Sequence, residues 1–168
     1  MVKQRRVFEQ GHRRKYLVIV DESPEVESAL FFAASRVEHT GGVICMLYVI
    51  EPTDFTQWAG VKDMQIEEET AKAKALFRLN RRKLDKIEAF ETIPTEEVIL
   101  SGKRPEEMLA LIDQDEDIAI LILGASTDTR GPGPLVSSLA TGKLAGSFPI
   151  PIVIVPGNLS LKDLQAMA

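Results

Sequence analysis

Two segments of this sequence carry residues suited to binding a phosphorylated ligand, and each follows a run of apolar residues. Asp21 comes directly after the run 16–20, and Gly124 comes directly after the run 118–123. The segment 125–134 is rich in Gly, Pro, Ser and Thr, so we expect it to form a loop. Glycine lets backbone N–H groups approach a phosphate closely, and hydroxyl groups can donate hydrogen bonds to it. The chemistry indicated is the binding of a phosphorylated compound.

The candidate phosphate-binding residues lie in this loop and at the start of the helix predicted after it. Pro134 suits the first turn of that helix and places Ser137 and Ser138 near its positive end, where anions are favoured. Arg130 is the only cation of the segment 125–134, and Asp128 offsets it. The alternative is a flexible loop that precedes a helix and binds no ligand. The candidates are Gly124, Ser126, Thr127, Arg130, Gly131, Gly133, Ser137 and Ser138.

Asp21 is the candidate for a polar contact at the other end of a ligand. It lies at the carboxyl end of the first predicted strand, where its sequence neighbours give it no obvious structural role. The alternative is that it caps the helix that is predicted to start at Ser23-Pro24.

No arrangement of residues points to catalysis or to a metal site. The sequence has no Gly-x-x-x-x-Gly-Lys-Ser/Thr loop and no Ser-His-Asp or Cys-His arrangement. His12 and His39 have no Cys or His partner at ligand spacing, and Cys45, inside the apolar run 43–47, is predicted to be a buried hydrophobic residue. We expect a binding protein and no enzyme, with at most slow hydrolysis of a nucleotide whose phosphates alone hold Mg²⁺.

Apolar runs that suit strands alternate with helical patterns along the whole chain. Continuous apolar runs are typical of strands that are covered on both faces, as in a parallel sheet. The pattern predicts an α/β fold with a doubly wound, five-stranded parallel sheet and helices on both faces, and ligands bind such sheets beyond the carboxyl ends of the strands. The predicted strands are 16–20, 43–50, 97–100, 118–123 and 149–155. The predicted helices begin near residues 23, 62, 105 and 135, and a loop through Asp54, Gln57, Trp58 and Gly60 precedes the second.

The charge of the chain is unevenly distributed. Residues 1–15 carry six Lys and Arg residues against Glu9 alone, whereas the whole chain has a net charge of −5. A basic arm can steer a protein toward nucleic acid or anionic lipid, or it can be a solvated leader. The acidic remainder argues against nucleic acid as the main partner.

The sequence also bears on the compartment. No apolar stretch approaches the ~20 residues of a membrane helix, and the N-terminus is charged where a signal peptide is apolar. A single cysteine fits a reducing compartment. We therefore expect a cytoplasmic protein without a membrane partner.

Segments from both halves of the chain resemble universal stress proteins. The opening, 16–52, has the strand, Asp-x-Ser, the helix, the paired glycines 41–42 and a strand that ends in Val-Ile-Glu-Pro. The segments 121–124 and 149–155 resemble the closing half of the same family. The resemblance implies a Rossmann-like sheet of strand order 3-2-1-4-5 in a domain over residues 15–157. A basic arm (1–14) then precedes the domain, and a tail (158–168) follows it.

The resemblance extends to the candidate loop. Family members that hold ATP share a loop of glycine, two residues, glycine, nine residues, and glycine followed by serine or threonine. The same spacing here gives Gly124, Thr127 and Ser137-Ser138, so two glycines are absent, which favours nucleotides with fewer phosphates. The resemblance places Asp21 and the backbone of Val49 at the adenine end of the site. It implies a protein of stress response or signalling that binds ATP, ADP or AMP.

The last predicted strand is apolar on both faces, and Ile152, Val153 and Ile154 form its middle. An exposed edge of this kind invites pairing with a second copy, and family dimers resemble this arrangement. We expect a homodimer through this strand and a protein partner that the sequence does not identify. The alternative function is a nucleotide-free dimeric module of the same fold that works through protein contacts alone.

Overall fold

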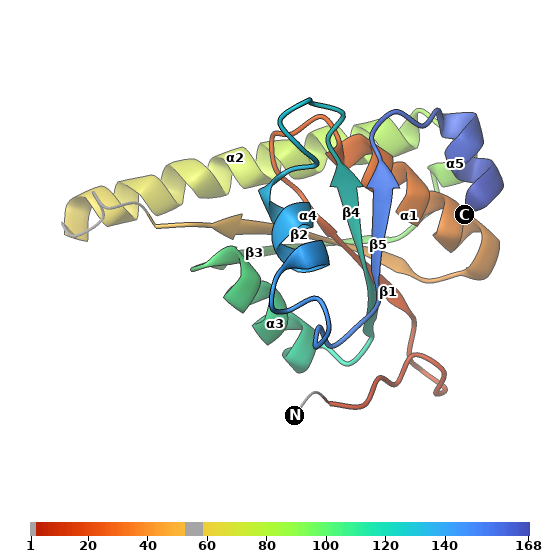
Figure 1. The fold of residues 1–168 in the computed structure, drawn as a ribbon, viewed down its shortest axis with the longest axis horizontal. Helices are drawn as coiled ribbons and strands as arrows, with labels where there is room; N and C mark the ends of the chain where they lie inside the picture. Colours follow the sequence, from red (N-terminus) through yellow and green to blue (C-terminus); the bar gives the residue numbers. More distant parts are fainter. Residues whose placement is uncertain (1–2, 53–58) are drawn as a thin grey trace.

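The computed structural model describes residues 3–52 and 59–168, and five parallel strands form its centre. The strands pair in the order β3-β2-β1-β4-β5 (Figure 1), which confirms the predicted fold class. Because β1 pairs with both β2 and β4, the strand order reverses beside β1. The strands are β1 (Lys15–Ile19), β2 (Val43–Ile50), β3 (Thr95–Ser101), β4 (Ile118–Ala125) and β5 (Ile152–Pro156).

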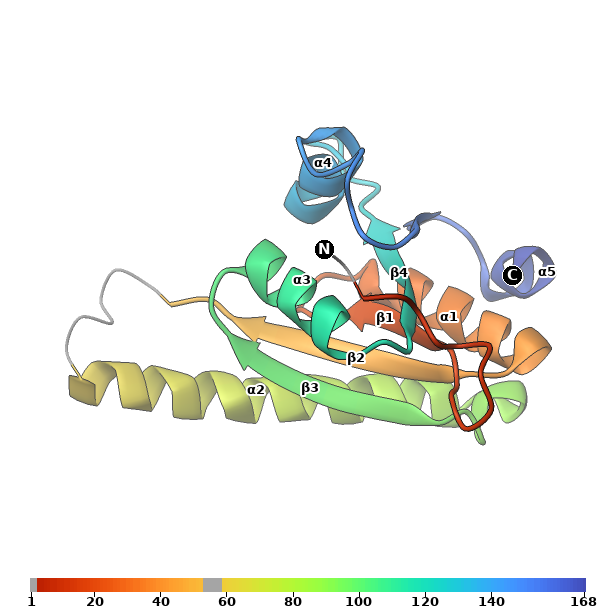
Figure 2. The ribbon, with the colours of Figure 1, turned by 90° about the horizontal axis from the view of Figure 1, so that it is seen from below.

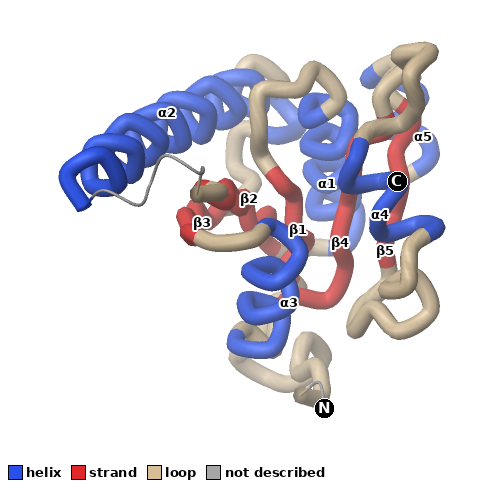
Figure 3. Tube along the Cα trace, turned by 60° about the vertical axis from the view of Figure 1, so that its left-hand side comes forward, coloured by secondary structure: helices blue, strands red, loops and turns tan. Residues whose placement is uncertain are grey.

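Helices cover both faces of the sheet (Figures 2 and 3). One face packs against α1 (Val26–Thr40), α2 (Ala59–Asp85) and α5 (Leu161–Met167), and the other against α3 (Arg104–Gln114) and α4 (Pro134–Thr141). A short 3₁₀ helix, η2 (Glu88–Phe90), joins α2 to β3. All eight residues of β2 are buried, which explains why its sequence is apolar throughout and does not alternate.

The predicted burial of Cys45 is confirmed. Its side chain belongs to the core on the α3 and α4 side of the sheet and is 1% exposed. Burial raises the pKa of the Cys45 thiol to about 12, so the thiolate that would make it reactive does not form at neutral pH.

The structure differs from the sequence prediction at several element boundaries. Helix α2 begins at Ala59 and includes Gly60, whereas we expected a loop as far as Gly60. Helix α4 ends at Thr141, before Gly142, and not at Ala145 as the apolar pattern suggested. Strand β5 begins only after Pro151, because proline has no N–H for the ladder. The predicted loop residues Asp54, Gln57 and Trp58 lie outside the described residues.

The segment expected to be a C-terminal tail contains a helix that packs against the body. The hydroxyl of Ser160 accepts a hydrogen bond from the N–H of Asp163 (3.1 Å) and caps the start of α5. Leu164 is buried in the core that α1 contributes to, and Nδ1 of His39 lies 2.7 Å from the carbonyl oxygen of Ala168. The Ser-x-x-Asp spacing of residues 160–163 is a sequence signal for this cap.

The basic arm packs against an acidic turn at residues 115–117. Nη1 of Arg5 donates to the carbonyl oxygens of Ile112 (2.6 Å), Asp115 (3.0 Å) and Ile118 (3.1 Å). His12 pairs with Asp117 at 2.6 Å. A fully solvated leader therefore does not describe this arm, since the side chains of Arg5, Arg6 and Arg13 have partners in the chain.

Candidate functional site

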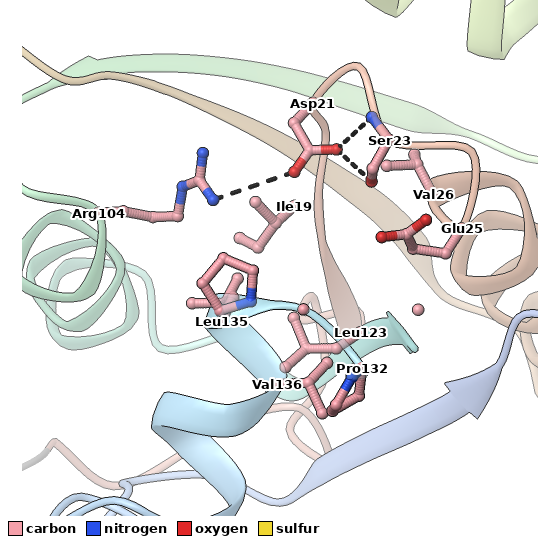
Figure 4. A pocket seen from close by; sticks show the side chains of 13 residues that line it. Ile19, Asp21, Ser23, Glu25, Val26, Arg104, Leu123, Pro132, Leu135 and Val136 are labelled. Atoms are coloured by element: carbon pink, nitrogen blue, oxygen red, sulfur yellow. Dashed lines mark hydrogen bonds and ion pairs between the residues drawn. The ribbon is translucent and has the colours of Figure 1, made fainter. Parts of the chain in front are cut away.

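A groove of three adjoining cavities lies beyond the carboxyl ends of the strands, beside the reversal of strand order. The middle one, the central cavity, has a volume of about 110 Å³ and opens between the ends of β1 and β4 (Figure 4). Its lining includes Ile19, Asp21, Ser23, Glu25, Arg104, Leu123, Gly124, Gly133, Pro134, Leu135 and Val136. This is the position where doubly wound sheets bind their ligands.

Two further cavities share lining residues with the central cavity. The loop cavity, of about 430 Å³, shares Glu25, Gly133 and Pro134 and extends along the segment 126–133. The Arg104 cavity, of about 230 Å³, shares Arg104, Pro134 and Leu135 and extends toward Glu51. Typical ligand sites have volumes from roughly 300 Å³, so a small ligand needs the central cavity together with a neighbour.

Asp21 lies just past the end of β1 and contributes one carboxylate oxygen to a turn. Its Oδ1 accepts hydrogen bonds from the N–H (2.8 Å) and the hydroxyl of Ser23. The N-cap of α1 is Glu25, so Asp21 fixes the turn before the helix and does not cap the helix itself. Its other oxygen, Oδ2, is turned toward Arg104, 4.0 Å from Nη1 (Figure 4). That oxygen is beyond hydrogen-bond distance of Arg104 and remains able to accept from a ligand.

Gly124 is required by packing, whatever the ligand. A Cβ at this position would lie 2.0 Å from the carbonyl oxygen of Glu25. Only glycine therefore lets β4 approach the turn between β1 and α1 this closely. Gly124 also lines the central cavity, so it shapes the groove through the position of that turn.

The segment 126–132 folds onto itself through its own hydrogen bonds. The N–H of Ser126 donates to the carbonyl oxygen of Pro132 (3.0 Å), and the N–H of Asp128 donates to the Ser126 hydroxyl (3.1 Å). The N–H groups of Arg130 (2.9 Å) and Gly131 (3.1 Å) both donate to oxygens of Asp128. These four N–H groups are therefore engaged within the loop, where a phosphate would need them free.

Arg130, the cation predicted to contact phosphate, is paired within the same loop. Its Nη2 lies 2.7 Å from Oδ2 of Asp128, and its side chain is 89% exposed. Hydrogen bonds from the Arg130 side chain and backbone lower the pKa of Asp128, so this carboxylate stays charged and offsets the guanidinium. The loop contributes little net positive charge to the groove.

Helix α4 begins at Pro134, as predicted, so that Ser137 and Ser138 are its fourth and fifth residues. Gly133 is its N-cap with φ 110°, a left-handed conformation that favours glycine, and Pro134 is its first residue. The N–H of Ser137 already donates to the carbonyl oxygen of Gly133 (3.0 Å). In the first turn, the N–H groups of Leu135 and Val136 lack intrahelical partners, and both residues line the central cavity.

The position of α4 places the two serines within the helix. Ser137 and Ser138 lie in its second turn, where Ser137 lines the loop cavity and Ser138 lines the Arg104 cavity. The glycine that precedes the helix is Gly133. Five residues, 128–132, separate it from Thr127, and nine separate Thr127 from Ser137.

The groove brings together some of the predicted site residues and leaves others outside. The loop cavity contains Ser126, Arg130, Gly131 and Gly133, and Ser138 lines the Arg104 cavity. The side chain of Val49 is 6% exposed and belongs to the core. Thr127 lies beside Gly157, past the end of β5.

Besides Ser23 and Glu25, sequence reasoning missed two polar groove residues, Arg104 and Glu51. Arg104 is the first residue of α3, and its guanidinium lies between two carboxylates, with Nη1 4.0 Å from Asp21 and Nε 3.8 Å from Glu51. The sequence held a signal for both. Glu51 follows β2 and Arg104 comes soon after β3, and the carboxyl ends of parallel strands meet at one edge of the sheet.

Over 3–52 and 59–168, no group of three His, Cys, Asp or Glu side chains is placed to hold a metal ion. No helix in these ranges is both long and apolar enough to span a membrane.

A model of the universal stress protein family matches residues 12–156. The chain belongs to the universal stress protein family. The resemblance in its opening and closing segments is thereby confirmed. No curated protein sequence gives a significant match.

Solved universal stress proteins share this fold at low sequence identity. The universal stress protein UspA from Lactobacillus plantarum has a TM-score of 0.67 and 17% identity, with 87% of this chain and 99% of that one covered. A universal stress protein in complex with cAMP has a TM-score of 0.58 and 14% identity, with 88% and 100% covered. One from Archaeoglobus fulgidus in complex with dAMP has a TM-score of 0.56 and 18% identity, with 86% and 98% covered. At such identities the likeness concerns the fold.

Proposed function

We propose that this universal stress protein binds an adenine nucleotide in the groove beyond β1 and β4. The observation that carries the proposal is the central cavity, which has the free oxygen of Asp21 on one side and the first turn of α4 on the other. Two solved relatives hold the adenine nucleotides cAMP and dAMP, which supports the same class of ligand here.

The two ends of the groove suit different parts of a nucleotide. The N–H groups of Leu135 and Val136 point from the positive end of α4 and suit an anion, so the phosphate belongs there. The carboxylate of Asp21 would repel a phosphate and suits the hydroxyl groups of the ribose. The base then extends toward Arg104 and Glu51.

The charges of the groove favour a ligand with few phosphates. Four carboxylates line it, those of Asp21, Glu25, Glu51 and Asp128, together with two cations, of which Arg130 is paired with Asp128. The engaged N–H groups of the segment 126–132 and the proline at the start of α4 remove further phosphate donors. We therefore propose AMP or a cyclic monophosphate as the preferred ligand over ATP, with Mg²⁺ held only through phosphates where ADP or ATP binds.

The proposed role is binding and signalling, with no turnover of the ligand. A phosphate in the groove would compete for the N–H groups that are bonded within the segment 126–132, and so change the surface that this segment presents to a protein partner. The second candidate is a nucleotide-free interaction module. The internal hydrogen bonds of the segment 126–132 favour this second candidate, because they give the N–H groups of the loop partners without a ligand.

One pair of measurements separates the two candidates. Mass spectrometry of the small molecules released from the purified, denatured protein identifies a ligand that co-purifies. Titration calorimetry with adenosine, AMP, ADP and ATP then ranks the affinities, and we expect AMP to bind at least as tightly as ATP. A protein that releases no nucleotide and binds none of the four is the interaction module.

Pro134→Ser is expected to tighten AMP binding about three- to tenfold while leaving the affinity for adenosine unchanged. The substitution adds an N–H and a hydroxyl at the first position of α4, where they can donate to a phosphate. A hydrogen bond to a charged group contributes about 1.5–3 kcal/mol, and the lost rigidity of proline costs about 0.4–1 kcal/mol. Calorimetry with the two ligands measures the difference. Equal changes for adenosine and AMP would place the phosphate elsewhere.

We also propose a homodimer through β5, and Ile154→Lys is expected to weaken it at least tenfold. β5 is the outermost strand on its side of the sheet, and Ile154 is 41% exposed. Val153 packs against the α1 core and Ile152 against the α4 core, so the outward residue is the suitable one to change. A lysine on the edge strand opposes pairing with a second copy.

Analytical ultracentrifugation of the parent and the variant tests the dimer. Val61→Lys is a matched control, because Val61 is 44% exposed on α2, away from β5. A parent that sediments as a monomer at micromolar concentration contradicts the proposal. So does a dimer that survives the substitution in β5 but dissociates with the one in α2.

A further inference from the structure

The guanidinium of Arg104 lies at the edge of the groove, and its buried Nε has no hydrogen-bond partner within residues 3–52 and 59–168. The nearest carboxylate oxygens, of Glu51 at 3.8 Å and Asp21 at 4.0 Å, are too far for hydrogen bonds. Burying an unsatisfied donor costs free energy, so this arrangement is costly unless a ligand completes it.

The surroundings hold Arg104 in place while leaving this donor open. Its backbone N–H donates to Oε1 of Glu51 (3.3 Å), which fixes the start of α3 beside the end of β2. The guanidinium lies across the central cavity from Leu135 and is turned toward Asp21 (Figure 4). The Arg104 cavity, which Glu51 also lines, continues the groove on that side.

A phosphate is a poor match for this position. The two carboxylates beside one guanidinium leave the corner with a net negative charge, which disfavours an anionic group. A neutral group that offers an acceptor to Arg104 and a donor to Glu51 fits the corner better. The edge of adenine has that pattern, because its N7 accepts and its N6 amino group donates.

We propose that Arg104 and Glu51 recognise the adenine base, with Arg104 donating to a ring nitrogen and Glu51 accepting from the amino group. This rests on the proposed function, since it requires a nucleotide whose phosphate lies at α4. The pair selects adenine over guanine, because guanine presents O6 and N7, two acceptors, and its O6 is repelled by Glu51. Arg104 and Glu51 are thus specificity-determining residues of the groove.

The test compares four ligands on the parent and three variants by titration calorimetry. The ligands are adenosine, AMP, guanosine and GMP. Arg104→Ala is expected to weaken adenosine and AMP by the same factor, about tenfold, because the lost contact is to the base. Glu51→Ala is expected to reduce the preference for adenine over guanine about tenfold. Arg82→Ala, at an exposed site on α2 that does not line the groove, is expected to change nothing.

The outcomes separate this inference from the function on which it rests. A larger loss for AMP than for adenosine in Arg104→Ala would show that Arg104 binds phosphate and would overturn the inference. A preference for adenine that persists in Glu51→Ala would also overturn the inference, but it would leave the proposed function, nucleotide binding, intact. If the parent binds none of the ligands, the proposed function is wrong, and the inference that rests on it is wrong as well. A fourth variant, Arg104→Gln, keeps an N–H donor near the position of Nε but removes the rest of the guanidinium and its charge. Together with thermal melts of each variant, it excludes a loss of binding caused by misfolding.

Discussion

Asp21→Ala is expected to weaken AMP binding by ten- to hundredfold. The substitution removes the carboxylate oxygen that faces the central cavity and would accept from the ribose. Hydrogen bonds to charged groups contribute about 1.5–3 kcal/mol, and 1.4 kcal/mol is a factor of ten in affinity. The affinity for adenosine should fall by the same factor as the affinity for AMP, because the lost contact is to the sugar. Titration calorimetry on the parent and the variant gives both ratios.

Two controls separate the contact from the turn that Asp21 holds. Ser23→Ala removes the hydroxyl that donates to Oδ1 but keeps the backbone donor, so the turn should persist with a small change in affinity. Asp63→Ala removes a carboxylate from an exposed site on α2 and should have no effect on binding. If Asp21→Ala binds AMP as tightly as the parent, Asp21 is outside the site. If Ser23→Ala loses as much affinity for AMP, the effect comes from the disrupted turn and not from a contact between Asp21 and the ligand.

The fold could be predicted because its determinants are local and repeated. Each central strand is a continuous apolar run, and β2 shows why, since helices bury it on both faces. Gly41, with φ 78°, ends α1 where the paired glycines predicted an end. Strand order followed from the resemblance, whose segments match at both ends of the chain.

The start of α4 could be predicted from the sequence. Pro134 suits the first turn of a helix, and the structure begins α4 there, with Gly133 as its N-cap in a conformation that favours glycine. The sequence did not show which N–H groups reach the groove. The N–H of Ser137 already donates to the carbonyl oxygen of Gly133, whereas those of Leu135 and Val136 have no partner within the helix.

Other features depend on contacts between residues far apart in the chain, which no local pattern reports. Arg5 reaches carbonyl oxygens more than a hundred residues away, and the basic arm is thereby held against the turn 115–117. Arg104 meets Glu51 only because β2 and β3 are neighbours in the sheet. Once the parallel order is known, the residues that follow each strand are the ones to inspect for a ligand site.

Gly124→Ala is expected to destabilise the protein by about 3 kcal/mol and to weaken nucleotide binding. The new Cβ would lie 2.0 Å from the Glu25 carbonyl oxygen, so β4 and the turn after β1 must move apart. Overpacking of this kind costs about 1–3 kcal/mol, and backbone atoms cannot move aside as a flexible side chain can. For a domain of this size that corresponds to a fall of roughly 6–12 °C in Tm.

Gly60→Ala is the matched control for that substitution. Gly60 lies in α2 with nothing within 4 Å of an added Cβ, and alanine there should stabilise the helix by about 0.5–1 kcal/mol. Thermal melts of both variants, and AMP titration well below each Tm, complete the test. Because Gly124 acts through the turn that carries Asp21 and Ser23, stability and affinity should fall together. A variant with full stability and lost binding would show instead that Gly124 contacts the ligand directly, and unchanged stability would contradict the close packing of β4 against Glu25.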